Sequence, residues 1–145
     1  MTSRFNEIEQ QVMTEMRKIY SEKAIDYAMN PRNVGHIKNA DGYARITGSC
    51  GDTMELSIKV EMEKIVDAKF WTDGCGTSIA CGSVVTELIK GKSVAEALRI
   101  DSEAILKVLG GLPEPDMHCS VLASDTLRAA IKDYISSIPA RGRIQ

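Results

Sequence analysis

The sequence has no marked excess of charge of either sign and no long apolar run. Lysine and arginine total 18, aspartate and glutamate total 20, and the formal net charge of the 145 residues is -2. Nonspecific nucleic-acid binding needs a basic face that neutralises phosphates, so we do not expect it here. A membrane-spanning helix needs about 18 consecutive apolar residues, and no such run occurs. Aromatic residues make up only 5%, so aliphatic side chains must fill the core.

Cysteine is also scarce. The chain has four cysteines, far below the density of a secreted domain held together by disulfides. No two of them form a C-x-x-C pair, which excludes zinc ribbons, thioredoxin-like sites and ferredoxin cluster motifs. No basic N-terminal segment leads into an apolar run, so we predict no secretory signal. We therefore expect a cytoplasmic protein whose thiols stay reduced.

The beginning of the chain has helical periodicity. Apolar residues recur at steps of three and four from Phe5 to Ile19 and again as far as Ala28, which predicts two helices in series. Ser21 is placed to cap the second helix. We expect residues 1–20 to form an N-terminal helical extension whose apolar stripe packs against the rest of the protein, with a dimer contact as the alternative.

The middle of the chain alternates with a period of two. Residues 54–60 and 66–72 alternate apolar and polar side chains, which is typical of strands with one buried face. The short polar link between them predicts a hairpin, and residues 43–47 predict a third strand. Together these segments predict an antiparallel meander.

Residues typical of helix starts and helix ends divide the chain after the predicted strands into several helices. The predicted signals are Gly91 as the residue after a helix over 77–90, a capping box from Ser93 to Glu96, Asp101 as an N-cap, and a stop at Gly110. The last helix is predicted to begin at Cys119 or Ser120. Strands followed by helices predict an α+β domain, with a three-stranded antiparallel sheet and helices packed on one face. We place this domain at 21–138 and a C-terminal tail at 139–145.

Three of the cysteines lie in loops or at helix starts. Cys50 lies in the loop between two predicted strands with Asp52 two residues later, Cys75 lies between two glycines before a helix, and Cys119 follows His118. A free cysteine is often just a small core residue. Three thiols in such places, with an imidazole and a carboxylate beside them, favour a metal site instead.

This donor set is incomplete for a permanent cluster. Stable iron–sulfur clusters usually take four cysteines, whereas Asp52 supplies a hard oxygen that binds iron less firmly beside thiolates. Such a site suits temporary occupancy. Cys81 does not fit the same site, because six helical residues turn it about 240° from Cys75 and move it about 9 Å along the axis. We predict that Cys81 is a packed core residue.

Several short motifs, in order, resemble the IscU/NifU family of iron–sulfur cluster assembly scaffolds from about Tyr20 to Tyr134. The motifs are Asn30-Pro31-Arg32-Asn33-Val34-Gly35, Cys50-Gly51-Asp52, Gly74-Cys75-Gly76 and His118-Cys119-Ser120. The combination is highly specific, although each motif alone is weak. The resemblance implies the IscU/NifU-N-like form of the α+β fold.

The resemblance also implies a function and its residues. Cys50, Cys75 and Cys119 match the cluster cysteines of the family, and Asp52 and His118 match its residues for iron binding and cluster lability. Members build a labile [2Fe-2S] cluster from iron and persulfide sulfur and pass it to apo-proteins, so the resemblance implies a scaffold and carrier rather than an enzyme. Cys119 is then the expected first persulfide acceptor.

The implied partners are a cysteine desulfurase of the IscS/NifS type and apo iron–sulfur proteins. The resemblance leaves open a frataxin-like protein, a ferredoxin and a homodimer. Many bacterial members recruit a chaperone through a Leu-Pro-Pro-Val-Lys loop, but this chain has Leu112-Pro113-Glu114-Pro115-Asp116, with an acid in place of the lysine. This departure argues against chaperone recruitment by that route.

Two other functions remain open at this point. The first is a zinc-binding sulfur acceptor of the SufU type, since the same residues could hold one tetrahedral zinc ion. The SufU branch carries an insertion before its last cysteine, and the 44-residue separation of Cys75 and Cys119 shows none. The second is a thiol enzyme with Cys119 as nucleophile. Adjacent helical residues point about 100° apart, so we expect His118 to be poorly placed to activate it.

Overall fold

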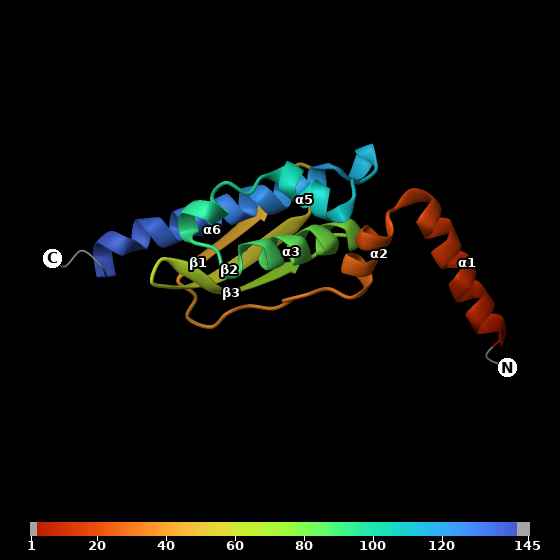
Figure 1. The fold of residues 1–145 in the computed structure, drawn as a ribbon, viewed down its shortest axis with the longest axis horizontal. Coiled ribbons are helices and arrows are strands. Elements are labelled where there is room, and N and C mark those ends of the chain that lie inside the picture. Colours follow the sequence, from red (N-terminus) through yellow and green to blue (C-terminus); the bar gives the residue numbers. More distant parts are fainter. Residues whose placement is uncertain (1–2, 142–145) are drawn as a thin grey trace.

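The computed structural model describes residues 3–141, and the surroundings of the side chains from 6 to 138. The elements, in chain order, are α1 (Ser3–Ile19), α2 (Glu22–Met29), β1 (Gly42–Thr47), β2 (Thr53–Glu61), β3 (Lys64–Thr72), α3 (Gly76–Ile89), α4 (Val94–Ala97), α5 (Ser102–Leu109), the 3-10 turn η1 (Glu114–Asp116) and α6 (His118–Arg141). The strands form one antiparallel sheet in the order β1-β2-β3. The predicted α+β class and three-stranded meander are confirmed (Figure 1).

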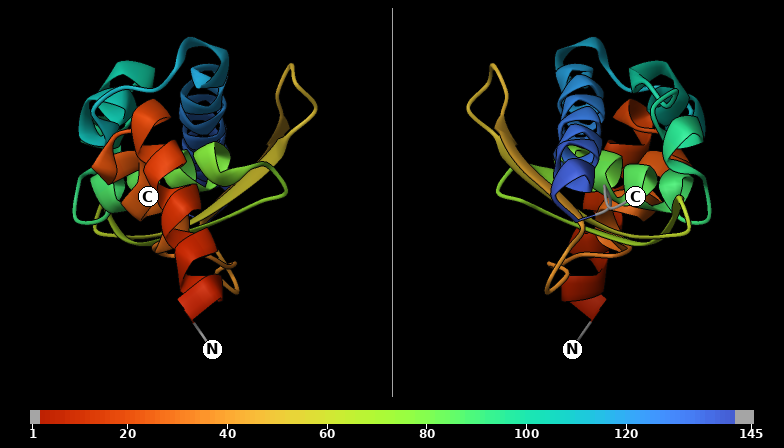
Figure 2. Two further views of the ribbon diagram at one scale, coloured as in Figure 1. Left: turned by 90° about the vertical axis from the view of Figure 1, so that its right-hand side faces the viewer. Right: turned by 90° about the vertical axis from the view of Figure 1, so that its left-hand side faces the viewer.

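Helices cover one face of the sheet. Figure 2 shows α6 and α3 side by side on the concave face, with α5 beyond them. The inward side chains of the strands meet these helices in a continuous, mostly aliphatic core, which includes Met54, Leu56, Ile58, Phe70, Val84, Leu127 and Ile131. The scarcity of aromatic residues is thus met by aliphatic packing, as expected.

The predicted helix ends are confirmed by their hydrogen bonds. Ser21 accepts from the backbone N–H of Ala24 at 3.0 Å, and Ser93 and Glu96 form a reciprocal capping box. Gly91 and Gly110 both have a positive φ, of 88° and 75°, which glycine adopts without steric cost. The start of α6 differs from the prediction, because His118 is already its first helical residue.

The outer face of β2 is more buried than its alternation predicts. Glu55 and Ser57 point away from the core, yet they are only 9% and 2% exposed. The segment between α2 and β1 crosses this face, where the backbone N–H of Ile37 donates to Ser57 at 3.0 Å and His36 Nε2 lies 2.9 Å from Glu55. The prediction of one buried face is therefore wrong for this strand, since a loop covers the other.

Most of helix α1 lies away from the rest of the protein. In Figure 1 it projects from the body beside α2, and Ile8, Val12 and Ile19 on its apolar stripe are 55%, 53% and 61% exposed. Among residues 6–19, Met13 and Met16 are partly buried and line cavities shared with α2, whereas the others are exposed. The prediction that this stripe packs against the domain is wrong for Ile8, Val12 and Ile19. At the other end α6 runs to Arg141, and residues 142–145 of the predicted tail lie outside the described residues.

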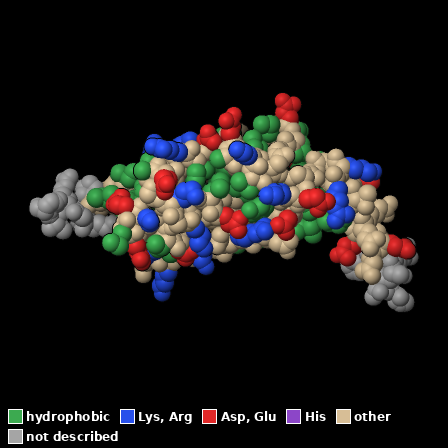
Figure 3. Space-filling view, in the orientation of Figure 1, with side chains coloured by type: hydrophobic (Ala, Val, Ile, Leu, Met, Phe, Trp, Pro, Cys, Tyr) green, Lys and Arg blue, Asp and Glu red, His purple; other side chains and the backbone are tan. Residues whose placement is uncertain are grey.

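Acidic and basic side chains are interspersed over the face shown in Figure 3, in keeping with the small net charge. Within residues 3–141, no helix is long and apolar enough to cross a membrane.

The contact between α3 and β3 depends on Gly82. A Cβ atom at this position would lie 2.5 Å from Cε2 of the buried Phe70 ring. We expect Gly82→Ala to lower the free energy of unfolding by about 1–3 kcal/mol, because the overpacked core must shift. Urea denaturation measures this, with Gly76→Ala as the control, because its Cβ would meet only Ala28 at an ordinary 3.6 Å. Equal destabilisation by both substitutions would contradict the packing argument.

Candidate metal site

Three chain segments meet at one end of the sheet: the β1–β2 loop, the β3–α3 junction and the start of α6. The loop closes through a hydrogen bond from the Gly48 N–H to the Asp52 carbonyl at 2.8 Å. The junction is held to the loop by two further bonds, from the Thr53 N–H to Asp73 Oδ1 at 2.8 Å and from Thr72 Oγ1 to the Thr53 carbonyl at 2.7 Å. These bonds fix the positions of the predicted ligand residues that flank them.

Gly74 makes the close approach of these segments possible. A Cβ atom on Gly74 would lie 2.5 Å from Ser78 Oγ and 2.9 Å from Asp52 Oδ2, both far inside van der Waals contact. A residue without a side chain is therefore required where the loop and α3 converge.

Asp52, His118 and Cys119 come together at this end. One ligand atom from each of these residues lies within 4.8 Å of the others, a spacing that a single metal ion or one edge of a cluster can bridge. His118 Nε2 lies 3.6 Å from Cys119 Sγ. The expectation that the imidazole would be poorly placed beside the thiol is wrong, because the two side chains approach each other at the first turn of α6.

The thiols of Cys75 and Cys119 have opposite environments. Cys75 is exposed and is the N-cap residue of α3. Partial burial disfavours its thiolate, but hydrogen bonds from Ser78 and Thr77 outweigh this and hold the pKa of Cys75 below its usual value. Cys119 is fully buried, and burial raises the pKa of its thiol to about 11.

The other cysteines are not members of this trio, although the side chain of Cys75 interacts with Cys119 and helps to raise the pKa of its thiol. Neither Cys50 nor Cys75 joins the described group of ligand atoms within 4.8 Å of one another. Both are exposed at its rim, so their place in a shared site stays a prediction. Cys81 is fully buried in the core, as expected of a packed residue.

Ser78 is a site residue that the sequence analysis missed. It is 0% exposed, and its Oγ lies 3.3 Å from Asp52 Oδ2 and 3.4 Å from Cys119 Sγ. Its position three residues after Cys75 is the signal that could have found it, because residues i and i+3 share one face of a helix.

A groove of about 390 Å³ opens beside the trio, between β1 and α6. One end carries Cys50, Asp52 and His118, and the far end carries Asp125; apolar side chains from β1 and α6 form the walls between them, namely Ile46, Val121 and Leu122. The predicted ligand residues on this side are therefore reachable from solvent through a cleft with apolar walls.

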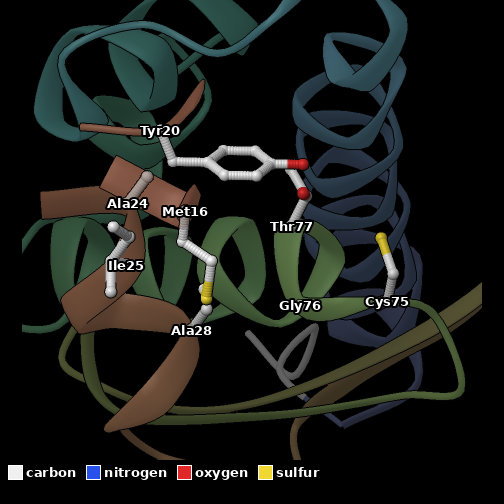
Figure 4. A pocket seen from close by; sticks show the side chains of 8 residues that line it. All are labelled: Met16, Tyr20, Ala24, Ile25, Ala28, Cys75, Gly76 and Thr77. Carbon is white, nitrogen blue, oxygen red and sulfur yellow. The ribbon is translucent and has the colours of Figure 1, made fainter. Parts of the chain in front are cut away.

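A second cavity, of about 230 Å³, lies on the other side of Cys75 (Figure 4). Tyr20 crosses its upper side with its hydroxyl beside Thr77. That hydroxyl donates to Asp116 Oδ2 at 2.7 Å, and this bond raises the pKa of Tyr20. Ser21 likewise donates to the Leu109 carbonyl. The turn after α1 is thus tied to the segment that leads into His118 and Cys119.

The model of the protein family described as "NifU-like N terminal domain" matches residues 19–140. The chain belongs to this family. Relatives of the NifU-like N-terminal family include "Iron-sulfur cluster assembly scaffold protein IscU 1" of Archaeoglobus fulgidus, which is 50% identical over 117 residues, covering 80% of this chain and 76% of the relative. The Escherichia coli K12 protein "Iron-sulfur cluster assembly scaffold protein IscU" is 49% identical over 127 residues, covering 84% and 98%.

Solved structures of the NifU-like family have the same fold. An iron–sulfur cluster assembly scaffold protein for the SUF system from Fervidobacterium islandicum AW-1 superposes with a TM-score of 0.66 at 31% identity, covering 79% of this chain and 97% of that one. The N-terminal part of a NifU-like protein from Brucella abortus gives a TM-score of 0.65 at 21% identity, covering 88% and 99%. At that identity the second likeness concerns the fold alone.

Proposed function

We propose that this protein is a scaffold on which a labile [2Fe-2S] cluster is assembled and from which it passes to apo-proteins. The observation that carries the proposal is the convergence of Asp52, His118 and Cys119, whose ligand atoms lie within 4.8 Å of one another. Their three segments come from distant parts of the sequence, so the fold itself builds the donor set. The names of the relatives support the same function.

The chemistry of the donors supports release as well as assembly. We propose that Cys50, Cys75 and Cys119 supply thiolates to the cluster, with Asp52 or His118 completing the set. A carboxylate oxygen is a hard ligand that exchanges more readily beside soft thiolates. The groove leaves Asp52 partly exposed to solvent, which gives a recipient protein access to the weakest ligand.

Cys119 is the proposed acceptor of sulfur. Its thiolate would attack the outer sulfur of a desulfurase persulfide, so that an S–S bond forms at Cys119 and the desulfurase thiolate leaves. His118 Nε2, at 3.6 Å, is placed to take the thiol proton. Because Cys119 is fully buried, this transfer requires the segment before α6 to move when the desulfurase binds.

The proposed partners follow from this reaction. A cysteine desulfurase supplies sulfur, and apo iron–sulfur proteins receive the cluster, so the protein acts as scaffold and carrier rather than as an enzyme. Asp116 replaces the expected basic residue of the chaperone loop and accepts a hydrogen bond from Tyr20. This intramolecular contact supports the view that the loop does not recruit a chaperone in the usual way.

Anaerobic reconstitution tests the proposal. The chain is incubated with ferrous iron, cysteine, a cysteine desulfurase and an excess of a thiol reductant, which supplies the electrons that convert persulfide sulfur to sulfide. The product is examined by visible absorption and Mössbauer spectroscopy. We expect a [2Fe-2S] signature that decays as an added apo-ferredoxin gains its own cluster. A protein that stays colourless under these conditions would contradict the scaffold function.

The alternative is a zinc-binding sulfur acceptor of the SufU type. The Fervidobacterium neighbour, named as a scaffold of the SUF system, favours it at 31% identity, and the Asp52–His118–Cys119 trio supplies three of the four ligands of a tetrahedral zinc ion. One tightly bound zinc ion per chain that iron and sulfide do not displace would establish this alternative.

Helix α1 is the proposed contact of a homodimer. Its apolar residues follow steps of three, four, four and three, from Phe5 through Val12 to Ile19. This spacing is the same in both directions, so two antiparallel copies of α1 would place Val12 against Val12. The exposed apolar stripe supports a second copy of α1 as its binding partner, because burial against a matching stripe removes both apolar surfaces from water.

Sedimentation equilibrium tests the pairing of α1. We expect the wild type to dimerise and Val12→Glu to raise the dissociation constant of the dimer by about 10-fold or more. A tenfold change corresponds to about 1.4 kcal/mol, and burying a carboxylate costs several times as much. Gln10→Glu, on the opposite side of the same helix, adds the same charge and should leave the dimer intact. A monomeric wild type would rule out the contact.

A further inference from the structure

Ser78 lies where the three segments of the site meet. It is in the first turn of α3, and its side chain is fully buried. Its Oγ reaches Asp52 Oδ2 in the β1–β2 loop at 3.3 Å and Cys119 Sγ in α6 at 3.4 Å. Its backbone also hydrogen-bonds the thiol of Cys75. One small residue thus contacts three of the predicted ligand residues, each from a different segment.

The surroundings fix this hydroxyl in place. A Cβ on Gly74 would lie 2.7 Å from the Ser78 Cβ and 2.9 Å from Asp52 Oδ2, so the backbone of Gly74 packs directly against the serine side chain. The hydroxyl carries one proton and can donate fully to one acceptor at a time. Asp52 and Cys119 therefore share a single donor, which draws the carboxylate and the sulfur toward one point.

We propose that Ser78 is a positioning residue that holds Asp52 and Cys119 at the spacing a bound metal ion or cluster requires, and that donates to the Cys119 sulfur once it is ligated. The proposal rests on the proposed function of this site. Partners behind metal ligands orient them and tune the metal, and their loss typically lowers affinity by about 10- to 100-fold. Hydrogen bonds to ligand sulfur also alter the electronic properties of a cluster.

Cobalt(II) binding to the metal-free chain tests the proposal without cluster assembly. We expect Ser78→Ala to weaken Co²⁺ binding by about tenfold and to move the sulfur-to-cobalt charge-transfer band to longer wavelength, because the sulfur loses its hydrogen bond. The matched control is Ser83→Ala in the same helix, equally buried, whose Oγ accepts from the Arg32 N–H at 3.1 Å and faces away from the site. The control should keep wild-type affinity and band position.

A double-mutant cycle separates positioning from a purely structural role. If Ser78 acts through Asp52, then Ser78→Ala combined with Asp52→Ala should cost less affinity than the sum of the two single changes. Strict additivity, an unmoved band or wild-type affinity in Ser78→Ala would each overturn the proposal. A Ser78→Ala chain that fails to fold by circular dichroism would also overturn it, since the hydroxyl would then serve the fold.

The two proposals fail in distinguishable ways. If the wild type forms no cluster in the reconstitution but Ser78→Ala still weakens Co²⁺ binding, the scaffold function is wrong and the positioning role stands. If clusters form and Ser78→Ala binds Co²⁺ as the wild type does, the positioning role alone is wrong.

Discussion

Replacement of Cys119 by serine is expected to lower the yield of reconstituted [2Fe-2S] cluster by more than about tenfold. Loss of a residue that only supports a ligand already costs about 10- to 100-fold in affinity, so loss of a ligand should cost at least as much. Cys119 lies at the centre of the site, with His118 Nε2 at 3.6 Å and Ser78 Oγ at 3.4 Å from its sulfur. Absorbance of the anaerobically reconstituted protein, normalised to iron and sulfide content, measures the yield.

Cys50→Ser and Cys75→Ser should lower the yield to a similar extent, although both thiols lie at the rim of the site. Cys81→Ala is the matched control, because Cys81 is free and fully buried in the core. It should keep the wild-type cluster yield. Loss of the cluster in Cys81→Ala alongside an intact fold would mean that the predicted ligand set is wrong.

Asp52→Ala is expected to lengthen the lifetime of the cluster by about tenfold, which corresponds to about 1.4 kcal/mol in the barrier to release. The substitution removes the hard oxygen and leaves His118, close to Cys119, as the remaining non-thiolate donor. A set of three thiolates and an imidazole holds iron more firmly than a set that includes a carboxylate. Decay of the visible absorbance and the rate of transfer to apo-ferredoxin should slow together.

The control for Asp52 is Asp125→Ala. Asp125 lines the same groove at its far end, so its removal changes the charge of the groove without removing a proposed ligand. Wild-type decay is expected for this variant. A cluster that decays faster in Asp52→Ala than in the wild type would contradict the role of the carboxylate in release.

Features that depend on neighbouring residues were predictable from the sequence. The cap at Ser21, the capping box at Ser93 and the positive φ at Gly110 all follow from local backbone chemistry. The alternation likewise identified Leu56, Ile58, Ala68 and Phe70 as inward side chains, but it was wrong at Val66, which is exposed while Ile65 is buried. The fold class followed from these elements together with the motifs.

Features that depend on distant segments were not predictable. The burial of Glu55 and Ser57 requires the crossing of a loop that carries no periodic signal. The exposure of α1 could not be read from its stripe, because an amphipathic pattern shows that a face needs covering but not what covers it. The position of Ser78 three residues after Cys75 places both on one face of α3, but that spacing gives no sign of its contacts with residues 26 and 41 positions away. The donors of the site were found through the motifs, whereas the residue between them appeared only in three dimensions.

The wide separation of the converging residues along the chain has a thermodynamic consequence. Asp52 and Cys119 meet only when the β1–β2 loop and α6 are both in place, so an unfolded chain offers no comparable binding site. Any ion or cluster held there stabilises the folded state by linkage, by about 2.7 kcal/mol when its free concentration is 100 times its dissociation constant. Handing the cargo to an acceptor therefore returns the protein to its less stable form, and resistance to unfolding becomes a direct gauge of how much of the scaffold is loaded.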